Sequence, residues 1–357
     1  MKNITLTVIF LTQYLVIFGQ TPINDPHWQL IWEDQFNSFD NTKWRKVNNC
    51  DHGGEPQLYL SQNVTTANGN LVITLRREEY SCPTNALINV WECGSCNQGM
   101  KHYTSGMVLS QVSEQVKYGY IEAMIKLPYG AGYWPAFWTW VGTPNYEEID
   151  IFEMIAGTSD VCNQTLFHNQ NVMTSNMHNC NGCIPGNFFC TSNYMTSLIS
   201  DYTQWHKYAV EWSPSKIIWY VDDYPYRVEE NDNKFDPTNI IFNFALNNHD
   251  NNAFPLGFAY GGLKLGQSSE MLVNYVKYYK LANSANSCNE IPSSCSYNFA
   301  THTNTVKKSI TFGNNTCPVT VPSDHPYYFR ASEGIQINGD FTVPLGSEIY
   351  MDVNPCY

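Results

Sequence analysis

Six consecutive residues decide how this chain is interpreted: Glu148-Ile149-Asp150-Ile151-Phe152-Glu153. Their alternation predicts a β-strand, in which every second side chain faces the same side of the sheet. A regular strand would place Glu148 and Glu153 on opposite faces. One extra residue, a β-bulge near Ile151 or Phe152, brings Glu153 to the face of Glu148 and Asp150. We therefore expect a bulged strand that gathers three carboxyl groups on one face.

Two glutamates on one face suit the hydrolysis of sugar polymers. Across the strand, the Cα atoms of Glu148 and Glu153 would lie roughly 13 Å apart. Side chains that lean together would bring the two carboxyl groups to about 5–5.5 Å, the spacing of a retaining glycosidase. The alternative is a strand that carries solvated acids. We favour the catalytic interpretation because the acids alternate with isoleucines and follow an aromatic stretch.

That aromatic stretch covers residues 133–140 and carries three tryptophans at strand spacing, Trp134, Trp138 and Trp140. Indole rings stack on the apolar faces of sugars and keep an N–H for a hydroxyl group. The alternative is that these rings fill the core. Beside three acids, we predict that Trp134 and Trp138 bind the substrate, and we leave the role of Trp140 open.

Length and charge restrict the class of protein. The chain has 357 residues, more than one core usually supports, so we expect a large and a small domain. Lys2 and the apolar residues 4–18 predict a signal peptide over residues 1–20, and no membrane span is expected. These features favour a secreted or cell-surface protein.

The net charge of the protein also restricts its partners. A net charge of −13 makes nucleic acid an unfavourable partner and favours a neutral polymer as substrate.

The chain has 12 cysteines, which fits disulfide bonds in an exported protein. The alternative is zinc, because Cys93-x-x-Cys96 and Cys180-x-x-Cys183 have ligand-like spacing. We favour disulfides, since the two pairs are far apart in the sequence. Their connectivity stays open, and we predict no metal site.

Short alternating segments recur from about Trp28 onward, which predicts two packed antiparallel sheets, a sandwich or jelly roll. An Asn68-Gly69 turn predicts a hairpin that leads into residues 71–75. Residues 118–127 are expected to send Ile121, Ala123 and the following odd positions to one face. The other expected strands are 207–212, 217–221, 240–246 and 271–279.

The composition shifts to Ser, Asn, Cys and Pro around residues 281–294, which predicts a linker. We therefore divide the mature chain into a catalytic domain, 21–283, and a small β-module, 284–357. In the module, Asn338-Gly339 lies between two alternating segments and predicts a second hairpin. The module's role stays open among carbohydrate binding, secretion or surface attachment, and capping of the main domain.

With these stretches in view, residues 30–280 resemble glycoside hydrolase family 16, in its bulged-motif, laminarinase-like branch. The matching stretches are the acidic strand, Trp134-Pro135-Ala136-Phe137-Trp138, Trp32-Glu33-Asp34-Gln35-Phe36, Asn68-Gly69-Asn70-Leu71, Tyr103-Thr104-Ser105-Gly106, Tyr118-Gly119-Tyr120-Ile121-Glu122 and Val273-Asn274-Tyr275-Val276. The resemblance implies an all-β jelly-roll sandwich with a substrate groove. It also implies retaining cleavage of β-linked polysaccharides, with no cofactor.

Carried onto this chain, the resemblance implies that Glu148 is the nucleophile and Glu153 the general acid/base. Asp150 would orient and tune both. Three carboxyl groups held this close do not all ionise freely, so one stays protonated near neutral pH. His168 is assigned to the strand expected after the acidic one, where family members often carry a histidine that contacts sugar. The alternative for this residue is a structural role.

We therefore predict a secreted, monomeric, endo-acting retaining β-glycanase that cleaves β-1,3-glucan or mixed-linkage β-1,3/1,4-glucan. Gly54 and Met124 replace a frequent Asn and Arg of the family, which leaves the exact substrate open. The alternatives are a galactan hydrolase of the agarase or carrageenase kind, a transglycosylase, and a non-catalytic glycan-binding protein on the same scaffold. Loss of either glutamate would indicate the last of these, and both are present.

Overall fold

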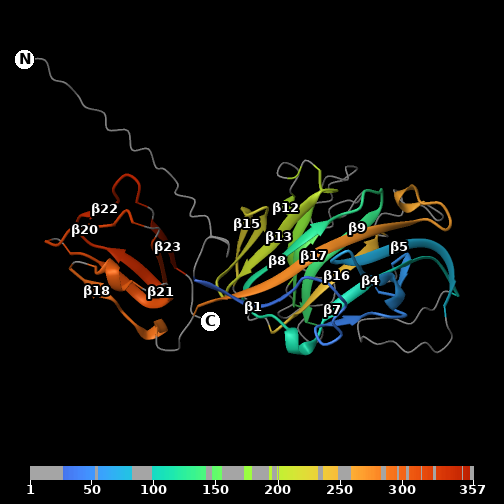
Figure 1. The fold of residues 1–357 in the computed structure, drawn as a ribbon, viewed down its shortest axis with the longest axis horizontal. Coiled ribbons are helices and arrows are strands. Elements are labelled where there is room, and N and C mark those ends of the chain that lie inside the picture. Colours follow the sequence, from blue (N-terminus) through green and yellow to red (C-terminus); the bar gives the residue numbers. More distant parts are fainter. Residues whose placement is uncertain are drawn as a thin grey trace, which may run out of the picture.

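A computed structural model describes most of the chain from residue 27 to residue 353 (Figure 1). The described residues are 27–52, 55–82, 99–141, 147–154, 173–178, 193–194, 199, 201–231, 236–247, 259–282, 287–295, 297–302, 305–314, 316–324, 327–347 and 349–353. The predicted signal peptide, His168 and the predicted boundary at 283/284 lie outside them.

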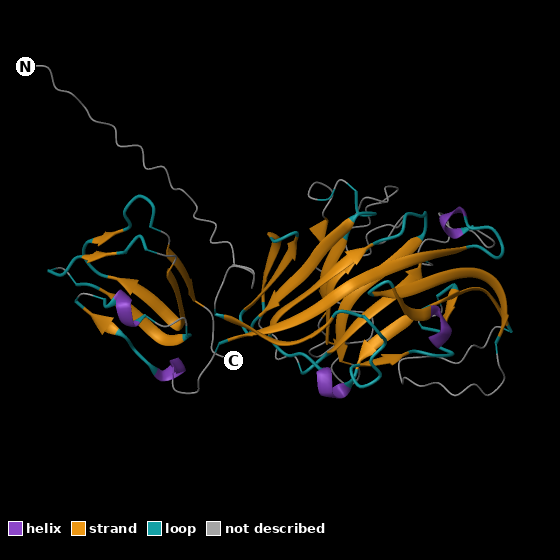
Figure 2. Cartoon of the chain, in the orientation of Figure 1, coloured by secondary structure: helices purple, strands orange, loops and turns teal. Residues whose placement is uncertain are grey.

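Strands dominate the described part, and its helices are short 3₁₀ turns (Figure 2). The turns are η1 (Ser61–Asn63), η2 (Val112–Glu114), η3 (Tyr260–Gly262), η4 (Ser287–Asn289) and η5 (Phe299–Thr301). None of the helices in this part is long and apolar enough to span a membrane.

The larger sheet of the sandwich has ten strands, and its main path runs β15-β14-β13-β8-β17-β5-β6-β3. Its strands are β1 (Trp28–Asp34), β3 (Gln57–Tyr59), β4 (Val64–Ala67), β5 (Asn70–Ser81), β6 (Met100–Ser105), β8 (Gly119–Lys126), β13 (Trp205–Trp212), β14 (Lys216–Val221), β15 (Tyr224–Glu230) and β17 (Ser268–Leu281). β1 pairs with β17, and β4 pairs with β5.

The smaller sheet has seven strands in the order β12-β11-β10-β9-β16-β7-β2. They are β2 (Trp44–Lys46), β7 (Met107–Ser110), β9 (Tyr133–Val141), β10 (Glu147–Glu153), β11 (Thr174–His178), β12 (Asn193–Tyr194) and β16 (Asn239–Leu246). In the described parts of both sheets every pairing is antiparallel except that of β3 with β6. The predicted all-β sandwich is confirmed.

The alternation in β8 shows why these segments pair as they do. Ile121, Ala123 and Ile125 are fully buried in the core cluster that lies between the sheets. Tyr120 belongs to a separate cluster on the outer face of the same sheet. The hairpin predicted at Asn68-Gly69 is also confirmed, because β4 and β5 pair directly across it.

Residues from β18 onward form a separate module with parallel pairing (Figure 1). Its strands are β18 (Ser293–Ser294), β19 (Lys307–Phe312), β20 (Val319–Thr320), β21 (Tyr327–Ile337), β22 (Phe341–Thr342) and β23 (Ile349–Val353). β21 pairs in parallel with β19 and β23, and β20 pairs in parallel with β22. Each of these pairs joins a strand in parallel to the second strand after it, which is the arrangement of a short β-solenoid.

The hairpin predicted at Asn338-Gly339 is therefore wrong. Gly339 does adopt a positive φ of 77°, as a turn requires, but the turn leads from one face of a coil to the next. The Asn338 backbone N–H donates to the Phe312 carbonyl of the preceding coil at 2.9 Å. Paired residues of β20 and β22, and of β21 and β23, lie 22 positions apart, and those of β19 and β21 lie 24 or 25 apart. The tripeptide Thr-Val-Pro recurs at the first of these distances, at residues 320–322 and 342–344.

The module packs against the outer face of the ten-stranded sheet. Val306 and Cys288 join an apolar cluster there with seven sandwich residues: Trp28, Tyr120, Ala209, Ile218, Tyr220, Tyr279 and Leu281. Charged groups surround this cluster. Asp352 of β23 contacts Arg330 of β21 at 2.9 Å and Lys216 of β14 at 3.2 Å. The module thus contacts the ten-stranded sheet, which does not contain β10, at one end of the sandwich (Figure 1).

All five cysteines in the described part of the chain are disulfide-bonded. Cys295 pairs with Cys317 inside the module. Cys50, Cys82 and Cys288 are also disulfide-bonded. The two cysteine pairs with zinc-like spacing lie outside the described residues. Within those residues, no group of three or more possible metal ligands is found.

Candidate active site

A break in the pairing of β10 confirms the predicted bulge. Asp150 lies opposite Trp138 of β9, but the next paired position is Phe152 opposite Phe137, so one residue of β10 is extra. Both Ile151 and Phe152 are therefore buried in the core cluster, although they are consecutive. The alternation resumes with Glu153 pointing away from the core.

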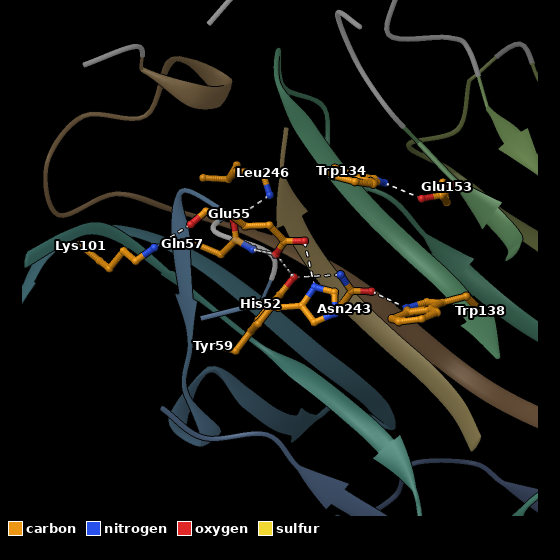
Figure 3. Close-up of polar contacts among 10 residues, drawn as sticks. All are labelled: His52, Glu55, Gln57, Tyr59, Lys101, Trp134, Trp138, Glu153, Asn243 and Leu246. Atoms are coloured by element: carbon orange, nitrogen blue, oxygen red, sulfur yellow. Dashed lines mark hydrogen bonds and ion pairs between the residues drawn. The ribbon is translucent and has the colours of Figure 1, made fainter. Parts of the chain in front are cut away.

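The carboxylate of Glu153 is held by two donors from the neighbouring strands. Trp134 of β9 donates its indole N–H to Glu153 Oε1 at 2.9 Å (Figure 3). Asn176 of β11 donates its amide Nδ2–H to Oε2 at 3.1 Å. The structure thus brings Trp134 and Glu153 together, and it adds Asn176, which the sequence analysis did not identify.

Asp150 is more deeply buried, with 1% of its surface exposed. Its backbone carbonyl accepts a hydrogen bond from Trp219 of β14 at 2.8 Å. The guanidinium of Arg227 lies 4.5 Å from the centre of the Trp219 ring and interacts electrostatically with Asp150. Burial lowers the pKa of Arg227, while neighbouring Glu229 opposes that effect. The backbone at the middle acid is therefore held by the opposite sheet, and its carboxyl group lies within the electrostatic reach of Arg227.

Glu148 is half-buried, and its Cα lies opposite Trp140 on β9 and His178 on β11. The strand next to β10 therefore carries a histidine at 178. The histidine predicted for the strand after the acidic one is His168, which lies outside the described residues. Residues 174–178 are Thr-Ser-Asn-Met-His, which carry no apolar alternation, so no local pattern marks this position.

The tryptophans of β9 share one face, as predicted. The Trp138 and Trp140 ring centres lie 5.9 Å apart, and both rings join a cluster on the side of the sheet away from the main core. Trp138 is only 8% exposed, and it donates its indole N–H to Asn243 Oδ1 at 2.8 Å. The expectation that Trp134 and Trp138 keep a free N–H for a sugar hydroxyl is wrong, because protein acceptors already take both.

A chain of buried polar contacts continues from Trp138 (Figure 3). Asn243 of β16 donates Nδ2–H to the Tyr59 hydroxyl at 3.0 Å, and Tyr59 donates to Glu55 Oε2 at 2.9 Å. Burial, and then the Glu55 carboxylate, hold the pKa of Tyr59 well above its ordinary value. The phenol therefore stays protonated and remains a donor to Glu55.

Glu55 lies at the end of this series of polar contacts and makes further ones (Figure 3). Gln57 donates to Glu55 Oε2, and the ring of His52 lies 3.3 Å from Oε1. Lys101 donates to the Glu55 carbonyl at 2.8 Å, and Gln57 accepts from the Leu246 backbone N–H at 2.9 Å. These side chains connect strands β3, β6, β9 and β16, and all of them except Trp138 are absent from the predicted site.

Such a sandwich, with carboxyl groups and tryptophans on one face of its smaller sheet, is the architecture of a carbohydrate-active enzyme. The family model "Glycosyl hydrolases family 16" matches residues 55–252, and the chain belongs to this family. It is an endo-acting glycoside hydrolase with a jelly-roll fold.

Individual curated relatives support this family assignment. The chain is 27% identical over 291 residues to the β-glucanase of Rhodothermus marinus, covering 71% of this chain and 86% of that protein. It is 31% identical over 208 residues to the κ-carrageenase of Pseudoalteromonas carrageenovora, covering 53% and 48% of the two chains. The chain spans less than half the length of several other curated relatives.

Among solved structures, the catalytic domain of an endo-1,3-β-glucanase (laminarinase) from Thermotoga petrophila RKU-1 is similar. It is 26% identical with a TM-score of 0.54, and the match covers 72% of this chain and 99% of that one. The match leaves about a quarter of this chain outside it, which is enough residues for the parallel module.

Proposed function

We propose that this enzyme cleaves β-1,3-glucan or mixed-linkage β-1,3/1,4-glucan within the polymer, with net retention of the anomeric configuration. The observation that carries the proposal is the bulge in β10, which turns Glu153 to the outward face of its sheet beside Glu148. The names of the Rhodothermus β-glucanase and the Thermotoga laminarinase support β-glucan as the substrate.

In the first half-reaction, Glu148 attacks the anomeric carbon while Glu153 gives a proton to the leaving glycosidic oxygen. The product is a covalent glycosyl-enzyme ester on Glu148. In the second half-reaction, Glu153 takes a proton from water, and the resulting hydroxide displaces Glu148 from the same carbon. Asp150 orients the two glutamates.

The two tryptophans Trp134 and Trp138 have different roles in this proposal. Trp134 holds one oxygen of Glu153, which keeps the general acid/base turned toward the substrate. Trp138, fixed by Asn243, offers a ring edge and face for a sugar unit of the polymer. His168 stays proposed as a further sugar contact.

The location and domain roles are proposed on other grounds. Disulfide bonding of the described cysteines supports export, directed by residues 1–20 as signal peptide. Residues 21–283 act as the catalytic domain and 284–357 as an appended module. We propose that the enzyme works as a monomer, with polysaccharide as its partner and no nucleic acid.

A panel of laminarin, lichenan, agarose and κ-carrageenan, with product analysis, tests the substrate. The proposal expects oligosaccharides of several lengths from laminarin or lichenan early in the reaction. Release only from agarose or carrageenan would favour the second candidate, a galactan hydrolase, which the κ-carrageenase relative supports. Binding without cleavage of any polymer would indicate a non-catalytic glycan-binding protein.

A further inference from the structure

One end of the Asn176 amide on β11 is hydrogen-bonded, and the other end has no partner among the residues that the structure describes. Its Nδ2 donates to Glu153 Oε2 at 3.1 Å. Its Oδ1 is buried, and no hydrogen-bond donor among the described residues reaches it. The residue is 7% exposed, so it is largely shielded from bulk water. A buried acceptor without a partner costs free energy, and the bond to Glu153 must therefore hold the amide in this orientation.

The second partner of Glu153 behaves differently. Trp134 reaches Oε1 at 2.9 Å through an indole N–H, which can only donate. This contact is the same whether Glu153 is ionised or protonated, provided that the proton resides on Oε2. An asparagine amide donates at one end and accepts at the other, and a half-turn about its terminal bond exchanges the ends.

We infer that Asn176 is a positioning residue for Glu153 that presents Nδ2 to the ionised carboxylate and Oδ1 to the protonated carboxyl. The inference rests on the proposed function, in which Glu153 carries a proton in one half-reaction and lacks it in the other. In each orientation one end of the amide bonds Glu153 and the other end stays unbonded. The two orientations are therefore closely balanced, and the proton decides between them.

Such an amide can bond Glu153 in both of its protonation states, as an acid and as a base. Two permanent N–H donors would favour the ionised form of Glu153 and would weaken it as an acid. An amide that can turn holds the carboxyl in place without favouring either form. In the protonated form, Oε2–H donates to Asn176 Oδ1 until the leaving oxygen of the substrate competes for that proton. In the ionised form, Nδ2 and Trp134 hold the two oxygens while the carboxylate takes a proton from the water that attacks the anomeric carbon.

Other charged groups near Glu153 also influence its titration. Glu148 and Asp150 lie on its own strand, and both oppose its ionisation when they are ionised. Arg227 of β15 approaches from the inner side, where it contacts Ser175 and interacts with Asp150. All of these groups stay in place when residue 176 is substituted, so a change at that position reports on the amide.

Two substitutions of similar shape separate the possibilities: Asn176→Leu, which neither donates nor accepts, and Asn176→Asp, which only accepts when ionised. The measurement is a ¹³C NMR titration of glutamate side-chain carboxyls, in which Glu153→Gln identifies the Glu153 signal. We expect Asn176→Leu to keep the midpoint within about 0.3 pH unit of the original, because both forms lose a partner. Asn176→Asp should raise the midpoint by about one unit or more.

The opposite results overturn the inference. A midpoint that Asn176→Leu raises by about one unit would make Asn176 a permanent donor, and a similar fall would make it a permanent acceptor. Turnover gives a second readout. Asn176→Leu should slow both laminarin hydrolysis, which needs the acid, and release of a glycosyl-enzyme formed from an activated aryl β-glycoside, which needs the base. Unchanged rates in both assays would also contradict it.

The titration does not require activity, so it stands apart from the proposed function. An original protein that cleaves no β-glucan contradicts the function, whereas the midpoints still decide the behaviour of Asn176. Asn274→Leu is the matched control. Asn274 is a half-buried asparagine that bonds the Gly69 carbonyl at 3.2 Å, far along the chain on β17, and its loss should leave the Glu153 midpoint unchanged.

Discussion

The indole N–H of Trp134 lies 2.9 Å from Glu153 Oε1, on the strand next to β10. This contact joins the tryptophan of the aromatic stretch directly to the proposed acid/base. Because the indole N–H is bonded to Glu153, we propose that Trp134 contributes to the reaction mainly through the position of Glu153.

Trp134→Phe keeps the ring face but removes the donor. A hydrogen bond to a charged group contributes about 1.5–3 kcal/mol, so we expect kcat to fall about 10- to 100-fold. KM for laminarin should change little, because the ring still lines the same face. Steady-state kinetics on laminarin check this. A normal kcat with a raised KM would instead make Trp134 a sugar-binding residue.

Tyr59→Phe interrupts the chain of contacts that fixes Trp138. It leaves Asn243 and Glu55 each without one partner, which should lower the free energy of unfolding by about 1–3 kcal/mol. A looser Trp138 should raise KM for long oligosaccharides more than for short ones, with kcat retained. Urea unfolding and kinetics over a length series provide the measurement. Tyr129→Phe, at a tyrosine that is 70% exposed, is the control.

Arg330→Met, at the contact between the module and the sandwich, should lower the free energy of unfolding by an amount that depends on pH. Burial raises the pKa of Glu211 above its ordinary 4.5, and Arg330 opposes that effect. A carboxyl whose folded pKa is raised favours the folded state below about pH 4.5 and loses that contribution as pH rises through the folded pKa. Without Arg330 the pKa rises further, so the destabilisation should grow with pH.

At pH 7.5 the loss should reach about 3–5 kcal/mol, the usual cost of leaving a buried charge without its partner. At pH 4.5 it should be clearly smaller. Thermal unfolding at both pH values measures the difference. Lys308→Met removes an exposed ion pair with Glu333 in the same module and should change Tm little at either pH. Equal losses for Arg330→Met at both pH values would contradict the role of Glu211.

The sandwich and the bulge could be predicted from sequence because both leave local signals. Alternation in residues 118–127 assigned Ile121 and Tyr120 to opposite faces, and the acidic strand matched a family motif whose bulge is known. The parallel module left a misleading signal. Asn338-Gly339 does turn the chain, but the partners of its flanking strands lie a full coil away, and a local pattern cannot specify such pairings.

The supporting residues of the site were missed for a similar reason. Asn243 lies 105 positions from Trp138 and 184 from Tyr59, and Asn176 lies 23 positions beyond Glu153. A single buried amide has no periodicity that would distinguish it from a surface asparagine. Only the folded arrangement, in which β9 pairs with β16 and β10 pairs with β11, reveals which polar groups meet.

The central claim is that the bulge in β10 makes Glu148 the nucleophile of a retaining enzyme. A 2-deoxy-2-fluoro β-laminaribioside with an activated leaving group should form a long-lived ester, because the fluorine slows release. Mass spectrometry of a peptic digest should then place the added glycosyl mass on the peptide that contains Glu148, and Glu148→Gln should abolish labelling. A label on another residue, or hydrolysis with inversion at the anomeric carbon, would contradict the account.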